Sequence, residues 1–446
     1  MNIVEKIFRN ADRHGIALIS EGEEIRYGRL IEMVDAAARR FARSAAARVG
    51  LDCPNGLAHV VLALAIVRAG KCLVPLAGEL SSRERERVIR ETGVGAIVDA
   101  LGEIRDVPVA AELGFDERAL AALDPVFIRF SSGTTGTSKG VVLSHESLLE
   151  RVIAANRGLD IGPSDRIVWI LPMAHHFAVS IMLYLLHGAT TIIENSHLAE
   201  DILTAATRHQ GTVLYGAPFH HALLASEGSG RSWPTLRLAV STAAKLPLAT
   251  AQAFDGRFGL SLAQGLGIIE VGLPLLNLRR SREKPASVGP PLPDYTAEVR
   301  GEGELFLRGP GMFDAYLRPW RLRAGVLEGG WFRTGDLARV DEDGDFHLLG
   351  RSHSVINVAG LKCFPEEIEA ILCEVPEVGW ARVSGKPNAR FGAVPVAEIV
   401  PRDPTNPPKI SALAAYCRGA LARYKVPVEF KLVESVPLTP SGKIQR

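Results

Sequence analysis

Short apolar runs alternate with longer segments up to about residue 285, and this pattern is typical of an α/β fold. The runs at 73–76, 96–98 and 126–130 are rich in β-branched or aromatic residues and predict strands. The nearly continuous apolar stretch 57–69 predicts a buried helix, whereas 81–92 is charged and predicts a helix that faces solvent. Because helices separate the strands, we expect βαβ units and a parallel sheet. Further strands are expected at 167–170, 190–193, 212–214 and 238–240, and a further helix at 30–47.

Beyond residue 285 the pattern changes. Residues 304–308 alternate between polar and apolar as an antiparallel strand does, and 331–336 and 344–351 resemble further strands and turns. The last 95 residues mix strands with helices at 365–373 and 411–421. The predicted fold class is therefore α/β. A large N-terminal domain of several subdomains, one of them small and β-rich, covers residues 1–350, and a small α+β domain covers 351–446.

One loop of the predicted N-terminal domain carries a clear chemical signal. Residues 131–140, between the strand at 126–130 and the apolar run at 141–143, consist only of Gly, Ser, Thr and one Lys. Free backbone N–H groups, several hydroxyls and a cation are what a polyphosphate cradle requires. Ser138 precedes Lys139 and Gly140 follows it, so this is not the Walker-type phosphate loop. A flexible surface loop is the alternative interpretation.

Composition and charge exclude several other classes of protein. The formal net charge is +1, which gives no electrostatic reason to expect nucleic acid or an anionic membrane as a partner. The five cysteines are scattered without Cys-x-x-Cys spacing, as expected for a reduced intracellular protein without a zinc site. We find no signal peptide, and the longest apolar stretch is too short to span a bilayer. A cytoplasmic location is expected.

Four further residues could carry chemistry. His175 and His176 follow the strand at 167–170, where open α/β sheets place their ligand crevice, although packing or capping is an open alternative for each. Glu270 follows a Gly-x-Gly segment, and one or two carboxylates usually hold the Mg²⁺ of a nucleotide. Lys443, near the end of the chain, would by itself be interpreted as a solvated tail residue.

Taken together, these stretches resemble the adenylate-forming superfamily of acyl-CoA and aryl-CoA ligases, adenylation domains of peptide synthetases and firefly-type luciferases. The resemblance extends over essentially the whole chain and rests on six motifs in the family's order. They are 131–140, 264–270, 330–336 (Gly-Trp-Phe-Arg-Thr-Gly-Asp), 350–360, 365–369 (Pro-Glu-Glu-Ile-Glu) and 440–443 (Pro-Ser-Gly-Lys).

The resemblance implies a two-step reaction. A carboxylate attacks the α-phosphate of ATP and gives an acyl-adenylate and pyrophosphate; a thiol, often that of coenzyme A, then displaces AMP. ATP, Mg²⁺ and coenzyme A are the implied cofactors. Glu270 matches the acid associated with magnesium, Lys443 matches the catalytic lysine, and His175 is the third implied catalytic residue. The implied ATP- or AMP-binding residues are Ser131, Thr134, Thr135, Lys139, Thr242, Ala243, Gln264, Gly265, Leu266, Asp336 and Arg351.

The resemblance also implies that the C-terminal domain is mobile. It would swing between the two half-reactions about a hinge that matches His353, a position that is usually Asp or Lys in the family. Asn357 and Gly360 would then line the tunnel for the thiol. The implied acyl pocket consists of His175, His176, Phe177, Gly267 and Ile269.

Two departures from the family pattern bear on the rate of adenylation and on the class of acid. Ile269 replaces a threonine whose hydroxyl contacts the α-phosphate, and loss of a hydrogen bond to a charged group costs about 1.5–3 kcal/mol. The Asp that follows Phe in adenylation domains for amino acids is absent, because Ala178 follows Phe177. An unpaired ammonium group would be costly there, so we expect an aromatic or fatty acid without an α-ammonium group.

Three alternatives stay open at this point. The acceptor could be the phosphopantetheine arm of a carrier protein instead of coenzyme A. Ile269 also leaves open a degenerate member of the family that binds an adenylate without turnover. An oxidase of the luciferase kind shares the fold, although nothing in the chain requires that activity.

Overall fold

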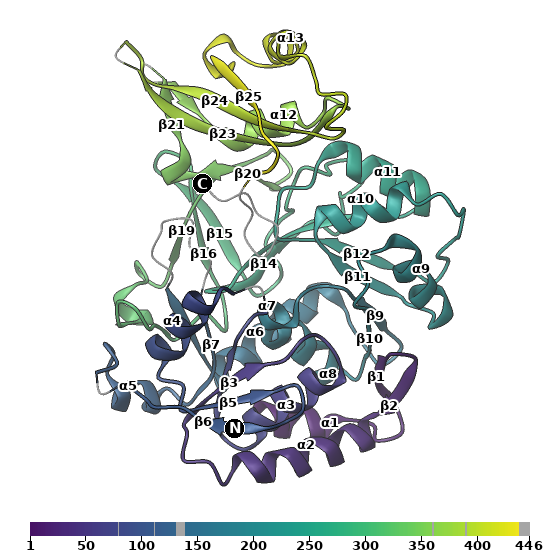
Figure 1. Cartoon of the computed structure of the whole chain (residues 1–446), viewed down its shortest axis with the longest axis vertical. Helices are drawn as coiled ribbons and strands as arrows, with labels where there is room; N and C mark the ends of the chain where they lie inside the picture. Colours follow the sequence, from purple (N-terminus) through teal and green to yellow (C-terminus); the bar gives the residue numbers. More distant parts are fainter. Residues whose placement is uncertain (79, 111, 131–138, 359–360, 389, 437–446) are drawn as a thin grey trace.

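The computed structural model describes residues 1–446 except positions 79, 111, 131–138, 359–360, 389 and 437–446. Its strands form four sheets. Three of them make up the large N-terminal part, and the fourth lies beyond residue 355, at the top of Figure 1. The α/β fold class, with a large N-terminal and a small C-terminal domain, is confirmed, whereas the boundary at residue 350 and the mobility of the C-terminal part stay predictions.

The first sheet is predominantly parallel. In spatial order its strands are β14 (Gly272–Leu276), β13 (Ala263–Ile268), β12 (Leu238–Ser241), β11 (Val213–Gly216), β9 (Arg166–Trp169), β10 (Thr190–Ile193), β1 (Ile16–Ser20) and β2 (Glu23–Arg26). Only the two edge strands, β14 and β2, pair antiparallel. Both faces are covered, and successive residues therefore enter different cores: Val168 packs on one face, while Ile167 and Trp169 pack on the other.

The second sheet contains the expected strands on both sides of the Gly/Thr loop. Its order is β18 (Arg321–Leu322), β17 (Ala315–Tyr316), β8 (Gly140–Ser144), β7 (Pro125–Phe130), β4 (Cys72–Pro75), β3 (Arg48–Asp52), β5 (Ala96–Asp99) and β6 (Ile104–Asp106). β7 and β8 pair antiparallel with Phe130 opposite Gly140, so the loop between them starts and ends at neighbouring points. β17 pairs with β8 on its other side.

Helices fill the space between these two sheets and cover their outer faces. The central layer shares one large core and includes α1 (Ile3–Asn10), α2 (Tyr27–Phe41), α3 (Leu57–Arg68), α6 (His145–Leu159) and α8 (Met182–Leu186). The first sheet is covered outside by α9 (Ala199–Arg208), α10 (Pro218–Ser226) and α11 (Leu248–Phe258), and the second by α4 (Ser82–Thr92) and α5 (Glu117–Ala122). No helix among the described residues is long and apolar enough to cross a membrane.

Two smaller sheets complete the chain. The third is antiparallel, with the order β15 (Thr296–Arg300), β16 (Glu304–Arg308), β19 (Phe332–Val340) and β20 (Phe346–Arg351). The fourth contains β22 (Leu361–Cys363), β21 (Ile356–Val358), β24 (Gly392–Pro401) and β23 (Val378–Asn388), with β25 (Glu429–Leu432) paired to β24. Helices α12 (Pro365–Leu372) and α13 (Ile410–Ala420) pack on it around a separate core.

Most predicted elements are present, with shifted ends. The helix expected at 30–47 is α2, which begins at Tyr27 and ends at Phe41. The Gly-x-Gly segment before Glu270 belongs to strand β13, which runs from Ala263 to Ile268. Its two glycines do not break the strand because β14 pairs with it along one edge and β12 along the other.

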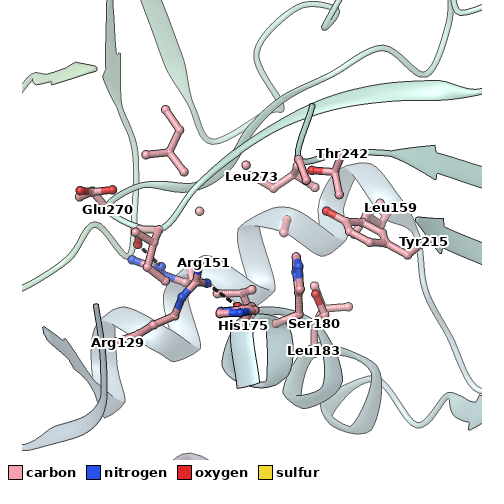
Figure 2. Close-up of a pocket in the computed structure, with 18 of the residues that line it drawn as sticks. Arg129, Arg151, Leu159, His175, Ser180, Leu183, Tyr215, Thr242, Glu270 and Leu273 are labelled. Carbon is pink, nitrogen blue, oxygen red and sulfur yellow. Dashed lines mark hydrogen bonds between the residues drawn. The ribbon is translucent and has the colours of Figure 1, made fainter. Parts of the chain in front are cut away.

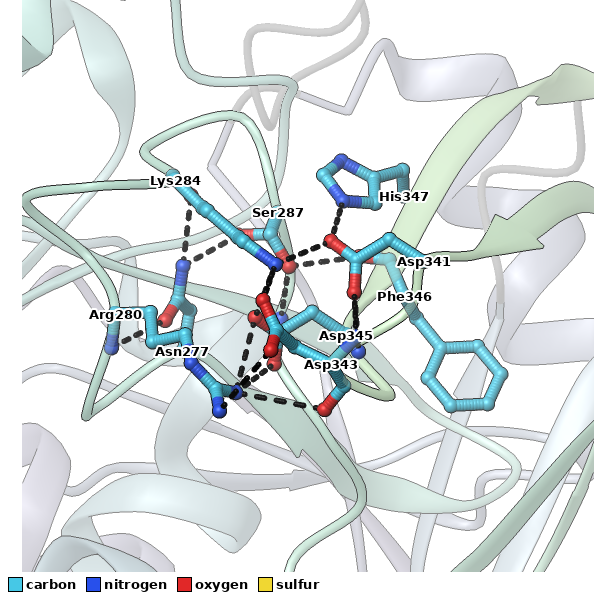
Figure 3. Close-up of polar contacts among 10 residues, drawn as sticks. Asn277, Arg280, Lys284, Ser287, Asp341, Asp343, Asp345, Phe346 and His347 are labelled. Carbon is cyan, nitrogen blue, oxygen red and sulfur yellow. Dashed lines mark hydrogen bonds and ion pairs between the residues drawn. The ribbon is translucent and has the colours of Figure 1, made fainter.

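A polar network joins the third sheet to the end of the first (Figure 3). Lys284 lies in the connection that follows β14, and its Nζ is 2.7 Å from Asp341 and 2.5 Å from Asp343, on the turn between β19 and β20. Arg280 pairs with the buried Asp345 at 3.3 Å, and Ser287 donates a hydrogen bond to the Phe346 carbonyl at 3.0 Å. This network fixes the sheet that carries Asp336 and Arg351.

The ion pairs of Lys284 predict a pH-dependent contribution to stability. Hydrogen bonds from Lys284 lower the pKa values of Asp341 and Asp343. Carboxyl groups with lowered pKa values stabilise the folded state above their unfolded pKa of about 3.9, and this stabilisation is lost as the pH falls through the folded-state values. We therefore expect Lys284→Met to lower the midpoint of thermal unfolding at pH 7, and the deficit to shrink at about pH 2.

The matched control is Arg29→Met, which removes an exposed helix-surface pair with Glu32 and should change the midpoint little at either pH. Thermal unfolding followed by circular dichroism measures all three proteins. A Lys284→Met deficit of the same size at both pH values would contradict the electrostatic interpretation.

Candidate active site

A cavity of about 220 Å³ lies at the carboxyl ends of the parallel strands β11, β12 and β13. Open α/β sheets bind their ligands at this edge, because backbone groups and loops converge there. Helix α6 closes one side of the cavity, and the segment that begins with α7 (Met173–His176) closes another.

The lining of the cavity is divided into a charged and a largely apolar side. Figure 2 shows Glu270, Arg129 and Arg151 on one side, and Tyr215, Thr242 and Leu159 on the opposite side. His175 lies between the two groups. An elongated ligand with an anionic end and an apolar end would match this division.

Arg129 comes from β7, the strand that leads into the Gly/Thr loop. Its Nη1 donates a hydrogen bond to the backbone carbonyl of His175 at 2.5 Å, which fixes the guanidinium group within the cavity wall. The bond also connects the second sheet to α7, the helix that follows strand β9 of the first sheet. Arg129 therefore brings a positive charge to the point where the two sheets meet.

Arg151, on α6, is a buried cation that shapes the segment before Glu270. Its guanidinium donates hydrogen bonds to the Ile269 carbonyl at 2.7 Å and to the Gly311 carbonyl at 2.8 and 2.5 Å. Burial lowers its pKa to about 10, so the group is still protonated at neutral pH. Carbonyl dipoles thus compensate this charge, and Arg151 in turn fixes the backbone of Ile269.

The apolar side is built on aromatic rings. Trp169 packs against Tyr184 and Tyr215 at centroid distances of 6.0 and 6.2 Å, and His176 meets Trp169 edge-on at 5.8 Å. Burial raises the pKa values of both tyrosines. The Tyr184 hydroxyl is hydrogen-bonded to the side chain of Ser180, and the Tyr215 hydroxyl to that of Thr242. Ser180 and Thr242 also line the cavity. The apolar side therefore offers aromatic faces and a few neutral hydroxyls.

Two local irregularities of the backbone border the cavity. Residues Phe177–Ile181 form a π-helical turn, a feature that is frequent at functional sites, and it places Val179 and Ser180 in the lining. Ala243 has φ 72°, which is costly for a residue with a Cβ. The turn after β12 thus retains a strained conformation next to Thr242.

Asp336 and Arg351 form an ion pair on the third sheet. They are register partners in β19 and β20, and Arg351 Nε lies 2.6 Å from Asp336 Oδ1. Arg351 lines the cavity, while Asp336 is buried behind it. The sequence placed these residues together only through the family resemblance, and the antiparallel hairpin accounts for their contact.

Glu270 is linked to the end of the Gly/Thr loop through Tyr316. The Tyr316 hydroxyl donates a hydrogen bond to Glu270 Oε1 at 2.9 Å, and the Lys139 ammonium lies 4.7 Å from the centre of the Tyr316 ring. Lys139 and Tyr316 line a second cavity of about 390 Å³, together with Arg321 and Arg333. Glu270 lines the first cavity and Tyr316 lines the second, so their hydrogen bond links two cavities that both have cations in their walls.

Some predicted site residues do not line this cavity. Phe177 packs in the core against His59 at 5.7 Å instead of lining the cavity, because the π-helical turn directs its ring inward. Gln264 is buried and accepts a hydrogen bond from the Leu246 N–H, while Gly265 and Leu266 pack along β13 next to β14. Asn357 is exposed on β21. By contrast, His175, His176, Thr242, Ala243, Gly267 and Ile269 all line the cavity.

Several predicted positions lie outside the described residues, namely Ser131, Thr134, Thr135, Gly360 and Lys443. His353 belongs to a short 3₁₀ turn, Ser352–Ser354, that follows β20. Within the part of the chain that the structure describes, no group of three or more His, Cys, Asp or Glu side chains could hold a metal ion.

Sequence reasoning missed Arg129, Arg151 and Tyr316. Arg129 interrupts an otherwise apolar strand, and this signal was available. Arg151 lies in an ordinary amphipathic helix, and Tyr316 lies in a two-residue strand too short to be predicted. Their partners are 46 to 160 residues away in the chain, beyond the range of local patterns.

Comparisons with known proteins identify the family of this chain. The model of the AMP-binding enzyme family matches residues 7–317, and the model of the AMP-binding enzyme C-terminal domain matches residues 367–443. A sulfoacetate–CoA ligase of Cupriavidus necator is 32% identical over 72% of this chain and 66% of that protein. A feruloyl-CoA synthase of Amycolatopsis is 29% identical over 89% of this chain and 87% of that protein.

The solved structures agree at the level of the whole fold. The crystal structure of ATP-bound MatB from Rhodopseudomonas palustris superposes with a TM-score of 0.87 at 25% identity, over 100% of this chain and 97% of that one. Since the first family model alone covers most of the chain, the resemblance inferred from the six motifs is confirmed. The chain belongs to the AMP-binding enzyme family and is an adenylate-forming enzyme of the acid–thiol ligase type.

Proposed function

We propose that this enzyme activates an aromatic or fatty acid without an α-ammonium group and transfers the acyl group to a thiol, that of coenzyme A. The observation that supports this most strongly is the division of the main cavity. Cations and Glu270 gather on one side, and aromatic and aliphatic side chains form the other. An acid would bind with its carboxylate toward the charged side and its acyl group toward Tyr215 and Leu159.

In the first half-reaction, a carboxylate oxygen forms a bond to the α-phosphorus of ATP, and the bond from that phosphorus to the β-phosphate oxygen breaks. Both reactants are anions, so positive charge has to compensate their repulsion as they approach. Arg129 lies in the wall of the cavity where the two would meet. On the proposal, Lys139 with Thr134 and Thr135 binds the pyrophosphate end, and Lys443 bridges the carboxylate and the α-phosphate.

Glu270 is the proposed protein ligand of magnesium. Its carboxylate lines the cavity, and Tyr316 engages one of its oxygens. A magnesium ion there would supply further positive charge to the phosphates. Asp336 would accept hydrogen bonds from the ribose hydroxyls, with Arg351 oriented beside it by their ion pair.

The lining supports the proposed class of acid. Glu270 is the only carboxylate among the described residues that line the cavity, and it lies on the charged side. An α-ammonium group would lie next to the carboxylate of the acid, and the proposal already assigns Glu270 to magnesium, so no carboxylate among the described lining residues is left to pair with it. Burial of an unpaired ammonium there would be costly, whereas an apolar or hydroxylated ring would find aromatic faces and the hydroxyls of Ser180 and Thr242.

In the second half-reaction, the thiol sulfur forms a bond to the acyl carbon, the carbon–oxygen bond to AMP breaks, and the thiol proton is released. On the proposal, the C-terminal domain swings about His353 and withdraws Lys443 between the two steps. Asn357 and Gly360 would then border the entering thiol. A carrier-protein thiol is the alternative acceptor, and the two acceptors differ only in what lies beyond the pantetheine arm.

Acid-dependent exchange of labelled pyrophosphate into ATP tests the proposal. A panel should contain cinnamic and benzoic acids with and without hydroxyl groups, fatty acids of graded length, dicarboxylic acids and amino acids. We expect exchange with an aromatic or fatty acid, none with amino acids, and thioester formation when coenzyme A is added. If no acid of the panel supports exchange, the proposed activity is rejected, and the protein binds an adenylate without turnover.

Lys443→Ala should separate the two half-reactions. Because the proposed role of Lys443 is confined to adenylation, the variant should lose exchange but still form thioester from a supplied acyl-adenylate. Exchange and single-turnover thioester formation measure the two steps. Equal loss in both would contradict the assigned role, and Lys431→Ala, a change at an exposed lysine, is the matched control.

The effects of substitutions at Arg129 and Ile269 on the exchange rate should depend on each other. Arg129→Met removes a cation that would contact the reacting anions, and loss of one such bond, about 1.5–3 kcal/mol, predicts a decrease in the exchange rate of about tenfold to a hundredfold. Ile269→Thr should keep or raise the rate, since it supplies a hydroxyl where Arg151 already fixes the backbone. Because the new hydroxyl and Arg129 would act on the same developing charge, the double variant should lose less activity than the product of the two single effects predicts.

Exchange kinetics of the two single variants and the double variant measure this coupling. If Arg129→Met leaves kcat unchanged, Arg129 does not act on the reacting groups. If Ile269→Thr lowers the rate strongly, the cavity depends on the shape of isoleucine.

A further inference from the structure

Tyr316 lies where three parts of the proposed site meet. It belongs to β17, which pairs with β8, the strand that begins directly after Lys139. Tyr316 is register partner to Val141, and the next residue, Leu317, donates a backbone hydrogen bond to the Gly140 carbonyl at 2.7 Å. The position of Tyr316 is therefore tied to the end of the Gly/Thr loop.

The segment that carries Tyr316 is also fixed to α6 and to Glu270. Asp314 accepts hydrogen bonds from the Ser144 N–H at 2.6 Å and from the Ser147 hydroxyl at 2.8 Å. Phe313 donates its backbone N–H to the Glu270 carbonyl at 2.8 Å. Glu270 is thus held through its backbone by Phe313 and through its carboxylate by Tyr316.

The hydroxyl and the ring of Tyr316 contact different residues. Its hydroxyl points to Glu270, which lines the main cavity, and its ring lies under the Lys139 ammonium in the second cavity. The ring is packed against Phe313 at 4.6 Å, which restricts its rotation.

From this geometry we infer that Tyr316 is a positioning residue that orients Glu270 through its hydroxyl and Lys139 through its ring. The inference rests on the proposed function, in which Glu270 binds magnesium and Lys139 binds the pyrophosphate end of ATP. One rigid phenol would then fix the distance between the groups that hold the two ends of the triphosphate. A merely structural tyrosine would matter for packing alone.

Two substitutions separate the two contacts. Tyr316→Phe keeps the ring and therefore the Lys139 contact, but removes the hydrogen bond to Glu270. Tyr316→Leu removes both. Tyr27→Phe is the matched control, because it also deletes a buried hydroxyl, bonded to the Ala189 carbonyl at 2.9 Å, in the core between α2 and the first sheet.

The experiment combines pyrophosphate exchange with calorimetric titration of magnesium pyrophosphate in the absence of any acid. For Tyr316→Phe we expect kcat of exchange to fall about tenfold, the loss of one hydrogen bond to a charged group, with pyrophosphate affinity within twofold of the unchanged protein. For Tyr316→Leu we expect the same loss of kcat and, in addition, a pyrophosphate Kd about fivefold higher, as loss of a cation–π contact predicts. Tyr27→Phe should lower thermal stability and change neither quantity.

Two results would overturn the inference. Tyr316→Phe with unchanged kcat would show that the hydroxyl does not orient Glu270, and equal effects of Phe and Leu on pyrophosphate affinity would show that the ring does not hold Lys139. If the unchanged protein shows no pyrophosphate exchange with any acid of the panel, the proposed function fails. The calorimetric comparison of the variants still decides the role of the Tyr316 ring.

Discussion

Electrostatic repulsion between two anions is the constraint on which the proposed reaction depends. A carboxylate and a triphosphate repel each other strongly in a partly buried cavity unless cations are already in place. The fold supplies these cations from parts of the chain that are distant in sequence. Arg129 comes from the second sheet, Arg151 from a central helix and Arg351 from the third sheet, and all three border one cavity.

Backbone carbonyl groups and one carboxylate compensate the electrostatic repulsion and desolvation of these positive charges. Arg151 is compensated by the carbonyls of Ile269 and Gly311, Arg129 donates to the carbonyl of His175, and Arg351 pairs with Asp336. Burial of a charge is tolerated when its hydrogen bonds are made in this way. The same bonds fix α7 and the segment before Glu270, so charge compensation and positioning of the site are achieved by the same contacts.

The parts of this structure that follow from local pattern were predictable. The strand β10 and the antiparallel strand β16 occupy the predicted residues. The helix predicted at 57–69 is α3, and it is buried on all sides from His59 to Val67, as its apolar sequence indicates. The phosphate-loop chemistry and Glu270 also carry local signals. Arg151 and Tyr316 could not be found in this way, because what distinguishes them is the partner that long-range packing brings to them. The inward direction of Phe177 depends on a π-helical turn, which periodicity does not reveal.

The fate of the oxygen atoms tests the proposed chemistry most directly. An acid selected by its exchange activity would be labelled with ¹⁸O in its carboxylate and converted to the thioester, and the AMP would be analysed by mass spectrometry. If the carboxylate attacks the α-phosphate and AMP leaves with the carbon–oxygen bond broken, one ¹⁸O atom appears in each AMP. Unlabelled AMP, or label in pyrophosphate or in inorganic phosphate, would contradict an acyl-adenylate intermediate.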